Sequence, residues 1–162
     1  MSKVQKITPF FWFNDNAEQA MEFYLSVFEN SKKLNVNYYG AGGPGPGGSV
    51  MVAAFELEGQ QFLALNGGPR FQFTEAISFA VNCDTQGEID ELWEKLSAGG
   101  EPGQCGWLKD QFGLSWQIVP SILPELMSDP DPAVPGRVMQ ELMQMAKLDI
   151  ARLQQAAAGE SL

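Results

Sequence analysis

The chain has 162 residues, of which 44% are hydrophobic and 19% are charged, so it can bury a sizeable core and is not expected to be disordered. Its formal net charge of −10 repels phosphate backbones and anionic lipid headgroups, so we expect no nucleic-acid and no membrane partner. A local basic spot of Arg70 and Lys109 is still open as a place for a small anion, although two solvated surface charges are the simpler interpretation.

The start of the chain and its two cysteines indicate a cellular compartment. The apolar stretch at 7–13 is too short and too aromatic for a signal peptide, and no apolar run is long enough to cross a bilayer. We therefore expect a cytoplasmic protein in which Cys83 and Cys105 are free thiols. The sequence contains no His that could act as a base for Cys105, which favours a structural or ligand-lining role for that thiol.

The first half of the chain predicts a strand, a helix and three further strands. Residues 4–13 are rich in aromatic and β-branched residues and predict a strand, and residues 16–29 carry apolar side chains at helical spacing. Residues 34–39 alternate between apolar and polar side chains. Residues 49–57 and 60–66 predict two strands joined by a tight hairpin turn.

A stretch rich in Gly and Pro, residues 40–48, separates the second and third predicted strands. Phosphate-binding loops of this composition lead into a helix. This stretch leads into a predicted strand, so we interpret it as a connection or a lid and not as a nucleotide cradle.

The second half repeats the same order of elements. Residues 75–82 predict a strand, 86–96 a helix, and 103–105 and 107–110 two short strands, followed by a last strand at 114–120. Two βαβββ modules, at about 4–69 and 75–120, therefore follow one another. Such repetition implies that the two modules pair and bury a shared surface.

The remaining residues, 121–162, predict a connector and C-terminal helices. Between 135 and 158 the apolar side chains, several of them Met, form two helical stripes. These stripes must pack either on the rest of the chain or on a partner, and the pattern leaves both possibilities open.

Several segments resemble one known superfamily. The order of elements and the segments 16–24 and 109–117 are similar to the vicinal oxygen chelate superfamily, which includes glyoxalases, extradiol dioxygenases and bleomycin-type resistance proteins. The segments 7–10, 65–69, 73–79 and 106–110 resemble its PhnB-like subgroup, whose members are labelled demethylubiquinone methyltransferases.

This resemblance implies an α+β fold in which two βαβββ modules form a curled mixed sheet around a cleft, with a C-terminal helical tail. It implies a single domain over residues 1–120, with residues 121–162 as connector and tail. It also implies a homodimer, and we expect the tail near the interface.

The resemblance also shows where a metal centre would be expected, because the ligand positions of the superfamily can be located in this sequence. The four positions that carry metal ligands in the superfamily fall here on Pro9, Ala64, Ala76 and Gln117. Amides alone bind transition metals poorly, so we expect no metal ligands and no cofactor. The alternative that Glu75, Asn66 and Gln117 together hold a hard ion such as Mg stays open. A methyl-donor site of the doubly wound type needs a Gly-rich turn between a strand and a helix, and we find no such turn in the sequence.

The predicted ligand site is a small apolar cleft with a few amides and hydroxyls. Its residues are Phe11, Phe13, Asn66, Glu75, Ser78, Cys105, Trp107 and Gln117. For the two Phe residues a core position is an equal possibility, whereas a buried amide without a partner costs about 1–3 kcal/mol and needs a ligand, water or another amide.

The sequence thus predicts a small-molecule-binding protein without the usual metal centre and without identifiable catalytic residues. The alternative is a metal-dependent lyase, oxygenase or transferase of the same superfamily, including the methyltransferase of the family label. Whether the chain is an enzyme is left open.

Overall fold

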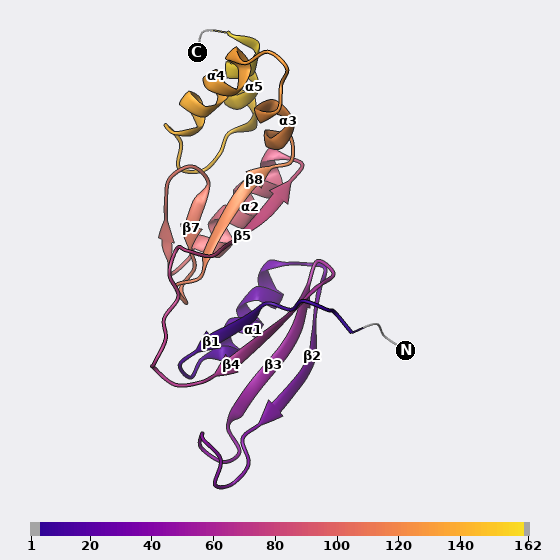
Figure 1. The fold of residues 1–162 in the computed structure, drawn as a ribbon, viewed down its shortest axis with the longest axis vertical. Helices are drawn as coiled ribbons and strands as arrows, with labels where there is room; N and C mark the ends of the chain where they lie inside the picture. Colours follow the sequence, from indigo (N-terminus) through magenta and orange to yellow (C-terminus); the bar gives the residue numbers. More distant parts are fainter. Residues whose placement is uncertain (1–3, 161–162) are drawn as a thin grey trace. The chain divides into compact units, whose positions relative to one another are not determined.

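The computed structural model describes residues 4–160, and the chain divides into two compact units between Phe73 and Thr74. The first unit is a four-stranded sheet with one helix (Figure 1). Its elements are β1 (Phe10–Phe13), α1 (Ala17–Val27), β2 (Ser31–Tyr38), β3 (Val50–Leu57) and β4 (Gln60–Asn66).

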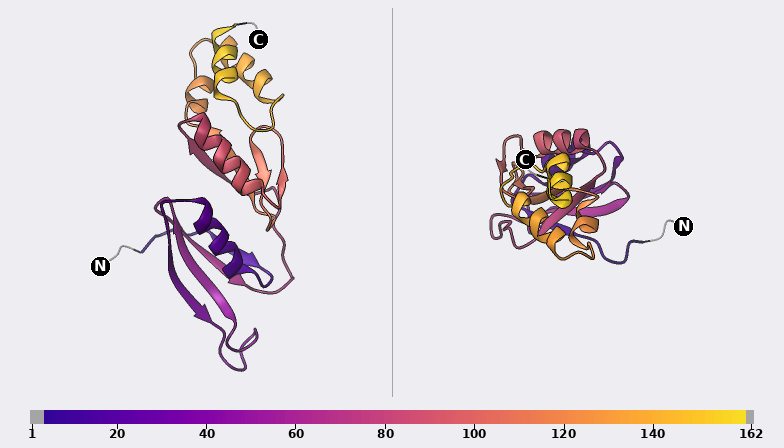
Figure 2. Two further views of the ribbon diagram at one scale, coloured as in Figure 1. Left: turned by 180° about the vertical axis from the view of Figure 1, so that it is seen from behind. Right: turned by 90° about the horizontal axis from the view of Figure 1, so that it is seen from above.

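The sheet of the first unit is mixed and has the strand order β1-β4-β3-β2. Strand β1 runs parallel to β4, whereas β4 and β3, and β3 and β2, are antiparallel. Helix α1 lies across one face of the sheet (Figure 2). Because side chains alternate between the two faces of a strand, alternate residues of β1, β3 and β4 pack under α1. The buried residues of the strands and of the helix include Phe11, Phe13, Ala17, Ala20, Met21, Tyr24, Ala53, Phe55, Phe62 and Ala64.

Aromatic rings form the centre of this core. Phe55 stacks on Tyr24 of the helix at a centroid distance of 6.1 Å and on Phe62 at 5.6 Å. Phe62 in turn stacks on Phe11 at 5.6 Å. Such aromatic pairs contribute about 0.5–1.5 kcal/mol each beyond the burial of their surface. The column of rings therefore ties the helix to three strands.

The segment rich in Gly and Pro joins β2 to β3 and closes around Tyr39. The Gly48 amide donates to the Tyr39 carbonyl at 2.8 Å, and the Tyr39 amide donates to the Ser49 carbonyl at 2.8 Å. A Cβ atom at Gly45 would come within 2.5 Å of the Tyr39 ring, so a larger residue there would have to displace that ring. The segment leads into a strand, as predicted.

The second unit repeats the arrangement and adds three helices. Its module consists of β5 (Ser78–Cys83), α2 (Gln86–Ser97), β6 (Glu101–Pro102), β7 (Trp107–Lys109) and β8 (Ser115–Pro120). The strand order is β5-β8-β7-β6, in which only the β5–β8 pair is parallel. Helix α2 covers one face of this sheet and buries Ile89, Leu92 and Leu96 (Figure 2). The Thr85 side chain caps it by accepting from the Glu88 amide at 3.2 Å.

Asp110 builds the turn between β7 and β8. Its side chain is buried, and Oδ1 accepts from the amides of Phe112 at 2.8 Å and Leu114 at 3.1 Å. Oδ2 accepts from the Trp116 indole at 2.9 Å. Asp110 thus fixes this turn through three hydrogen bonds from its buried carboxylate.

The C-terminal tail packs on itself and on the second module. Its helices are α3 (Leu123–Met127), α4 (Ala133–Leu142) and α5 (Ile150–Ala158). They enclose a small core of Val134, Val138, Met145, Leu148 and Leu153. The amides of Cys105 and Gly106 each donate to tail carbonyls, those of Met145 and Ala146, at 2.8 Å. Much of the apolar stripe that the sequence left without a partner is therefore covered within the chain.

The two βαβββ modules and the helical tail confirm the predicted α+β fold, with differences at the element boundaries. The strand predicted at 103–105 is a turn, and a two-residue strand at Glu101–Pro102 takes its place. Helix α3 was not predicted, because five residues are too few to show a helical period. No helix in residues 4–160 has both the length and the apolar character needed to cross a membrane. The cleft shared by the two modules stays a prediction.

Candidate functional site

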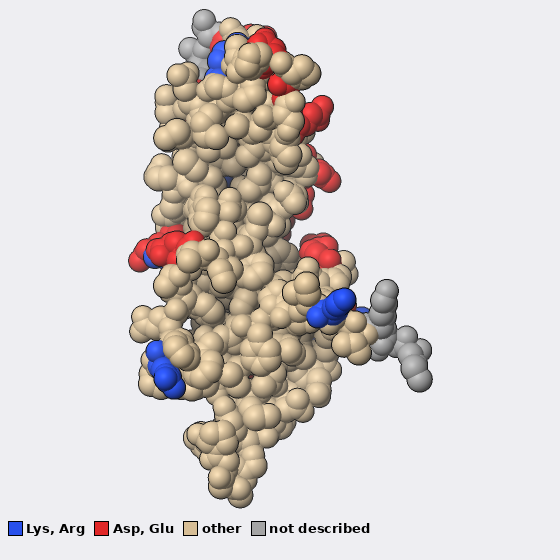
Figure 3. All heavy atoms as spheres, viewed as in Figure 1, with Lys and Arg blue, Asp and Glu red and all other residues tan. Residues whose placement is uncertain are grey.

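The first sheet leaves the face opposite α1 without a helix, and this face is not the one predicted. Phe11 and Phe13 lie under α1 and are only 6% and 3% exposed. The open face instead carries their neighbours Phe10 and Trp12, together with side chains of β3 and β4 such as Leu65. Figure 3 shows few charged side chains over β3 and β4 on this face.

Asn66 also lies on the side of α1, where both polar atoms of its side chain and its backbone carbonyl are hydrogen-bonded. Its Oδ1 accepts from the amide of Ala17 at 2.8 Å and so caps the first turn of α1. Its Nδ2 donates to the Val50 carbonyl at 3.1 Å, and its carbonyl accepts from the Tyr39 hydroxyl. Asn66 thus joins the end of β4 to α1 and β3.

For Phe11 and Phe13 the structure therefore supports the core position that the sequence had left open beside the cleft position. The predicted orientation of Asn66 is wrong, because its side chain belongs to the helix-covered face and not to an open cleft. The cause is a shift of one residue in the position carried over from the superfamily, because one step along a strand moves a side chain to the opposite face. The amide of Asn66 is satisfied within its own unit and does not require a ligand.

The second sheet places the other predicted residues on its open face. Ser78, Ser115 and Lys109 are neighbours across β5, β8 and β7, and Gln117 lies next to Trp107. Gln117 Nε2 donates to Ser78 Oγ at 2.9 Å. Ser78, Trp107 and Gln117 are thus brought together as the sequence predicted.

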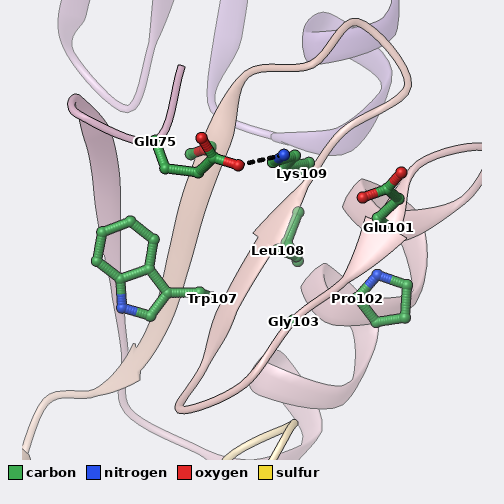
Figure 4. Close-up of a pocket in the computed structure, with 8 residues that line it drawn as sticks. Glu75, Glu101, Pro102, Gly103, Trp107, Leu108 and Lys109 are labelled. Carbon is green, nitrogen blue, oxygen red and sulfur yellow. Dashed lines mark ion pairs between the residues drawn. The ribbon is translucent and has the colours of Figure 1, made fainter. Parts of the chain in front are cut away.

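A cavity of about 200 Å³ opens beside this group of side chains (Figure 4). Trp107 and Lys109 on β7 and Ser115 on β8 contribute to its walls. Glu75 reaches it from the segment before β5, and the rest of the wall comes from β6 and the turn after it. The complete lining is Glu75, Glu101, Pro102, Gly103, Trp107, Leu108, Lys109 and Ser115.

Sequence reasoning missed the β6 side of this cavity. Glu101 and Pro102 form a strand of two residues, which is too short to show the alternation that marks a strand. Gly103 is required where it lies, because a Cβ atom there would come within 2.7 Å of the Trp107 carbonyl oxygen. The two glycines at 99 and 100 signal the end of α2 but not the path of the next residues.

An ion pair between Glu75 and Lys109 spans the edge of the cavity (Figure 4). The hydrogen bond from Lys109 lowers the pKa of Glu75, and the same bond raises the pKa of Lys109. Both groups therefore stay charged through the neutral pH range. Both are exposed enough that the pair adds little to stability. Lys109 is thus already engaged by a carboxylate of its own chain.

Ser115 differs from the other lining residues because its hydroxyl is buried and has no hydrogen-bond partner. The residue is 1% exposed. Among the buried side-chain oxygen and nitrogen atoms of residues 4–160, its Oγ is the one that has no hydrogen-bond partner. A buried hydroxyl without a partner costs about 1–3 kcal/mol. A ligand that donates to or accepts from Ser115 would remove this cost.

The two cysteines have different surroundings, and both are free thiols. Cys83 is fully buried under α2. Burial, assisted by the charges of Glu88 and Asp84, raises the pKa of this thiol to about 12. Cys105 is half-buried in the turn before β7 and has a positive φ of 59°. It faces the tail segment that contains Met145 and is not among the residues that line the cavity.

The residues at the superfamily's metal positions do not suit a divalent transition metal. Pro9 and Ala64 have no donor atom, and Gln117 offers an amide that is already bonded to Ser78. Within residues 4–160, no three Cys, Asp or Glu side chains gather around a point where they could share an ion. The Mg alternative loses one member, because Asn66 caps α1. We therefore derive no chemistry from a metal.

Comparison with known proteins identifies the family. The family model described as 3-demethylubiquinone-9 3-methyltransferase matches residues 5–119. The chain belongs to this family. Its resemblance to the glyoxalase/bleomycin resistance/dioxygenase superfamily and to the PhnB-like subgroup is confirmed. A search of curated proteins finds no match.

One solved structure supports this assignment, and two more distant ones share the fold. A PhnB protein from Bacillus cereus that carries the same family name is 39% identical, and the alignment covers 72% of this chain and 99% of that one with a TM-score of 0.65. A Pseudomonas aeruginosa protein is 20% identical over 72% of this chain and 97% of its own, with a TM-score of 0.60. The fosfomycin resistance protein FosX from Listeria monocytogenes, solved with Mn(II) and sulfate, shares the fold at 15% identity, 78% and 96% coverage and a TM-score of 0.52.

The bonds of Asn66 predict a role in stability. Replacing Asn66 with Ala removes the cap of α1 and leaves the Val50 carbonyl without its donor, so we expect the free energy of unfolding to fall by about 1–3 kcal/mol. Chemical denaturation followed by circular dichroism measures this change. Asn82→Ala, at an exposed position of β5, is the control and should change the stability by less than about 0.5 kcal/mol. Equal losses in both variants would contradict the role of Asn66.

The difference between the two thiols predicts selective labelling. At pH 8 the Cys83 thiol stays protonated and buried, so iodoacetamide should modify Cys105 and leave Cys83 intact in the folded protein. Peptide mass spectrometry identifies the labelled residue, and the unfolded protein, in which both thiols react, is the control. Labelling of both residues at equal rates in the folded protein would show that the second module opens around Cys83.

Proposed function

We propose that this chain binds a small, mainly apolar molecule in the cavity of its second module. The observation that carries this proposal is the combination of the 200 Å³ cavity with the unpartnered hydroxyl of Ser115. Trp107 and Pro102 supply apolar surface, and Glu75 and Lys109 supply charge at the edge. A concave apolar site with a few polar groups is the usual composition of a small-molecule pocket.

Binding in this proposal does not depend on a metal ion. Pro9, Ala64 and Gln117 do not offer the carboxylate and imidazole ligands that hold a transition metal. FosX of Listeria monocytogenes was solved with Mn(II), but at 15% identity the likeness concerns the fold. A metal-dependent lyase, oxygenase or transferase is the alternative function, and it requires ligands from other positions.

The methyltransferase activity in the family name has little support from the residues of this chain. A methyl-donor site of the doubly wound type needs a Gly-rich turn that leads from a strand into a helix. Of the two Gly-rich segments, the one at 40–48 leads into β3 and the one at 67–69 leads into a segment without a helix. We therefore do not include methyl transfer in the proposal.

The proposed site can be tested by the molecule that the purified protein retains. We expect a small molecule to co-purify with the protein and to be visible by mass spectrometry after denaturation, and Trp107→Ala should reduce its amount at least about tenfold, because the aromatic wall is lost. Trp93→Ala on α2, which does not line the cavity, is the control. Equal amounts in both variants would place the bound molecule elsewhere.

The metal content of the same preparation, expressed without a histidine tag, separates the two functions. One tightly held transition-metal ion per chain would favour the metal-dependent alternative.

We further propose that the protein is a cytoplasmic homodimer. The two free thiols suit a reducing compartment, and the superfamily resemblance implies a dimer. Helices α3–α5 bury most of their apolar side chains against each other, but Met139 and Met143 stay 41% and 65% exposed. These two side chains are the part of the tail that is still available to a partner.

Light scattering tests the dimer and the role of the tail. We expect the full chain at micromolar concentration to have twice the 17.8 kDa mass of one chain, and Met143→Glu to shift it toward the monomer because a charge is costly in an apolar interface. Gln154→Glu, which adds the same charge at an exposed position of α5, is the control. A monomer mass for the full chain would contradict the homodimer.

A further inference from the structure

The charges around the cavity of the second module do not balance. Two of its lining residues, Glu75 and Glu101, are acidic and one, Lys109, is basic, so the lining has a net charge of about −1 at neutral pH. Glu75 is paired with Lys109, whereas Glu101 makes no ion pair within residues 4–160, although its charge also acts on Lys109. Figure 4 shows Glu75 and Glu101 on opposite sides of Lys109. Glu101 thus leaves one carboxylate at the edge of the cavity to interact with a ligand.

The net negative charge of the whole chain, like that of the cavity lining, attracts cations. The formal net charge of −10 raises the local concentration of small cations and lowers that of small anions. The sequence had left Lys109 open as part of an anion site. An anion site is less favourable because Glu75 already neutralises Lys109. A ligand carboxylate would have to displace Glu75 and would then lie near the negative charge of Glu101.

The apolar wall and the orphan hydroxyl suit the same type of ligand. An aromatic ring attracts an organic cation through the negative face of its π system, and Trp107 supplies that ring. An ammonium group carries three donors and no acceptor, and Ser115 Oγ offers lone pairs without a donor. For size, an engineered apolar cavity of roughly 150 Å³ holds a benzene molecule, so a cavity of about 200 Å³ accepts one ring with a short side chain.

We propose that the cavity selects a small organic cation, a single ring with a protonated amino group, that contacts Trp107, Glu101 and the hydroxyl of Ser115. This inference rests on the proposed binding function and specifies the charge of the ligand. It assigns Glu101 as the residue that determines selectivity, Ser115 as the hydrogen-bond acceptor and Trp107 as the apolar wall.

Three probes of nearly equal size and different charge test the inference. Benzylamine, benzyl alcohol and benzoate are titrated into the full-length protein at pH 7, and binding is followed by saturation-transfer NMR and by the indole N–H signals of ¹⁵N-labelled protein. We expect benzylamine to bind roughly three- to fivefold tighter than benzyl alcohol, the range of a partly exposed ion pair, and benzoate to bind more weakly than either. The indole signal that is missing in Trp107→Phe should be the one that shifts.

Variants separate the charge from the pocket. Glu101→Gln should remove the preference for benzylamine over benzyl alcohol, whereas Glu94→Gln, at an exposed position of α2, should keep it. Lys109→Gln should tighten benzylamine about twofold or more, because it removes a like charge. Ser115→Ala should weaken benzylamine, and an unchanged melting temperature would exclude a loss of folding as the cause.

The outcomes distinguish the proposed selectivity for cations from the proposed binding of small molecules in the cavity. If all three probes bind equally well, or if Glu101→Gln and Glu94→Gln behave alike, the proposed selectivity for cations is wrong and small-molecule binding in the cavity is supported. Tighter binding of benzoate than of benzylamine would also overturn the selectivity. If none of the probes moves the Trp107 signal at concentrations up to the millimolar range, both the selectivity and the proposed site are wrong.

Discussion

Each βαβββ module of this chain has one helix for one four-stranded sheet, and the other features of the structure depend on this ratio. A single helix covers one face of its sheet, so strand residues divide into those under the helix and those on the open face. In the first unit Phe11, Phe55 and Phe62 fall under α1 and form the aromatic column. In the second module the open face carries the polar side chains of Ser78 and Gln117, which hydrogen-bond to each other, and that of Ser115, whose hydroxyl is buried beside the cavity.

The consequence for function is that the two open faces differ in chemistry. The first sheet presents mostly apolar side chains such as Trp12 and Leu65. The second presents hydroxyls, an amide and an ion pair around a cavity. Such a surface can select a molecule by shape, charge and hydrogen bonds without a metal ion or a nucleophile. Cys83, the more protected thiol, lies on the face under α2 and takes no part in it.

The candidate site could be predicted only in part, and the misses have a common cause. Ser78, Trp107 and Gln117 lie together on one face of the second sheet, as expected, because they occupy paired or alternating positions on neighbouring strands. Their role in ligand binding stays a prediction. Asn66 was placed on the wrong face because a strand position that is wrong by one residue reverses the orientation of the side chain. Its amide seemed to need a ligand, but α1 begins next to it and supplies the Ala17 amide. The sequence does not show that the end of β4 lies next to the start of α1.

The sequence by itself determined the order of elements, the two βαβββ modules, the family and the poor fit of the residues to a metal, because these depend on local periodicity and on which side chains exist. Only the tertiary structure decided that Asn66 is a helix cap, that Glu75 neutralises Lys109, and that Ser115 keeps a buried hydroxyl without a partner. Each of these facts depends on which residues of distant segments or adjacent strands the fold brings next to each other. Hydrogen bonds and ion pairs act over a few ångströms, so only the folded arrangement decides which of them form.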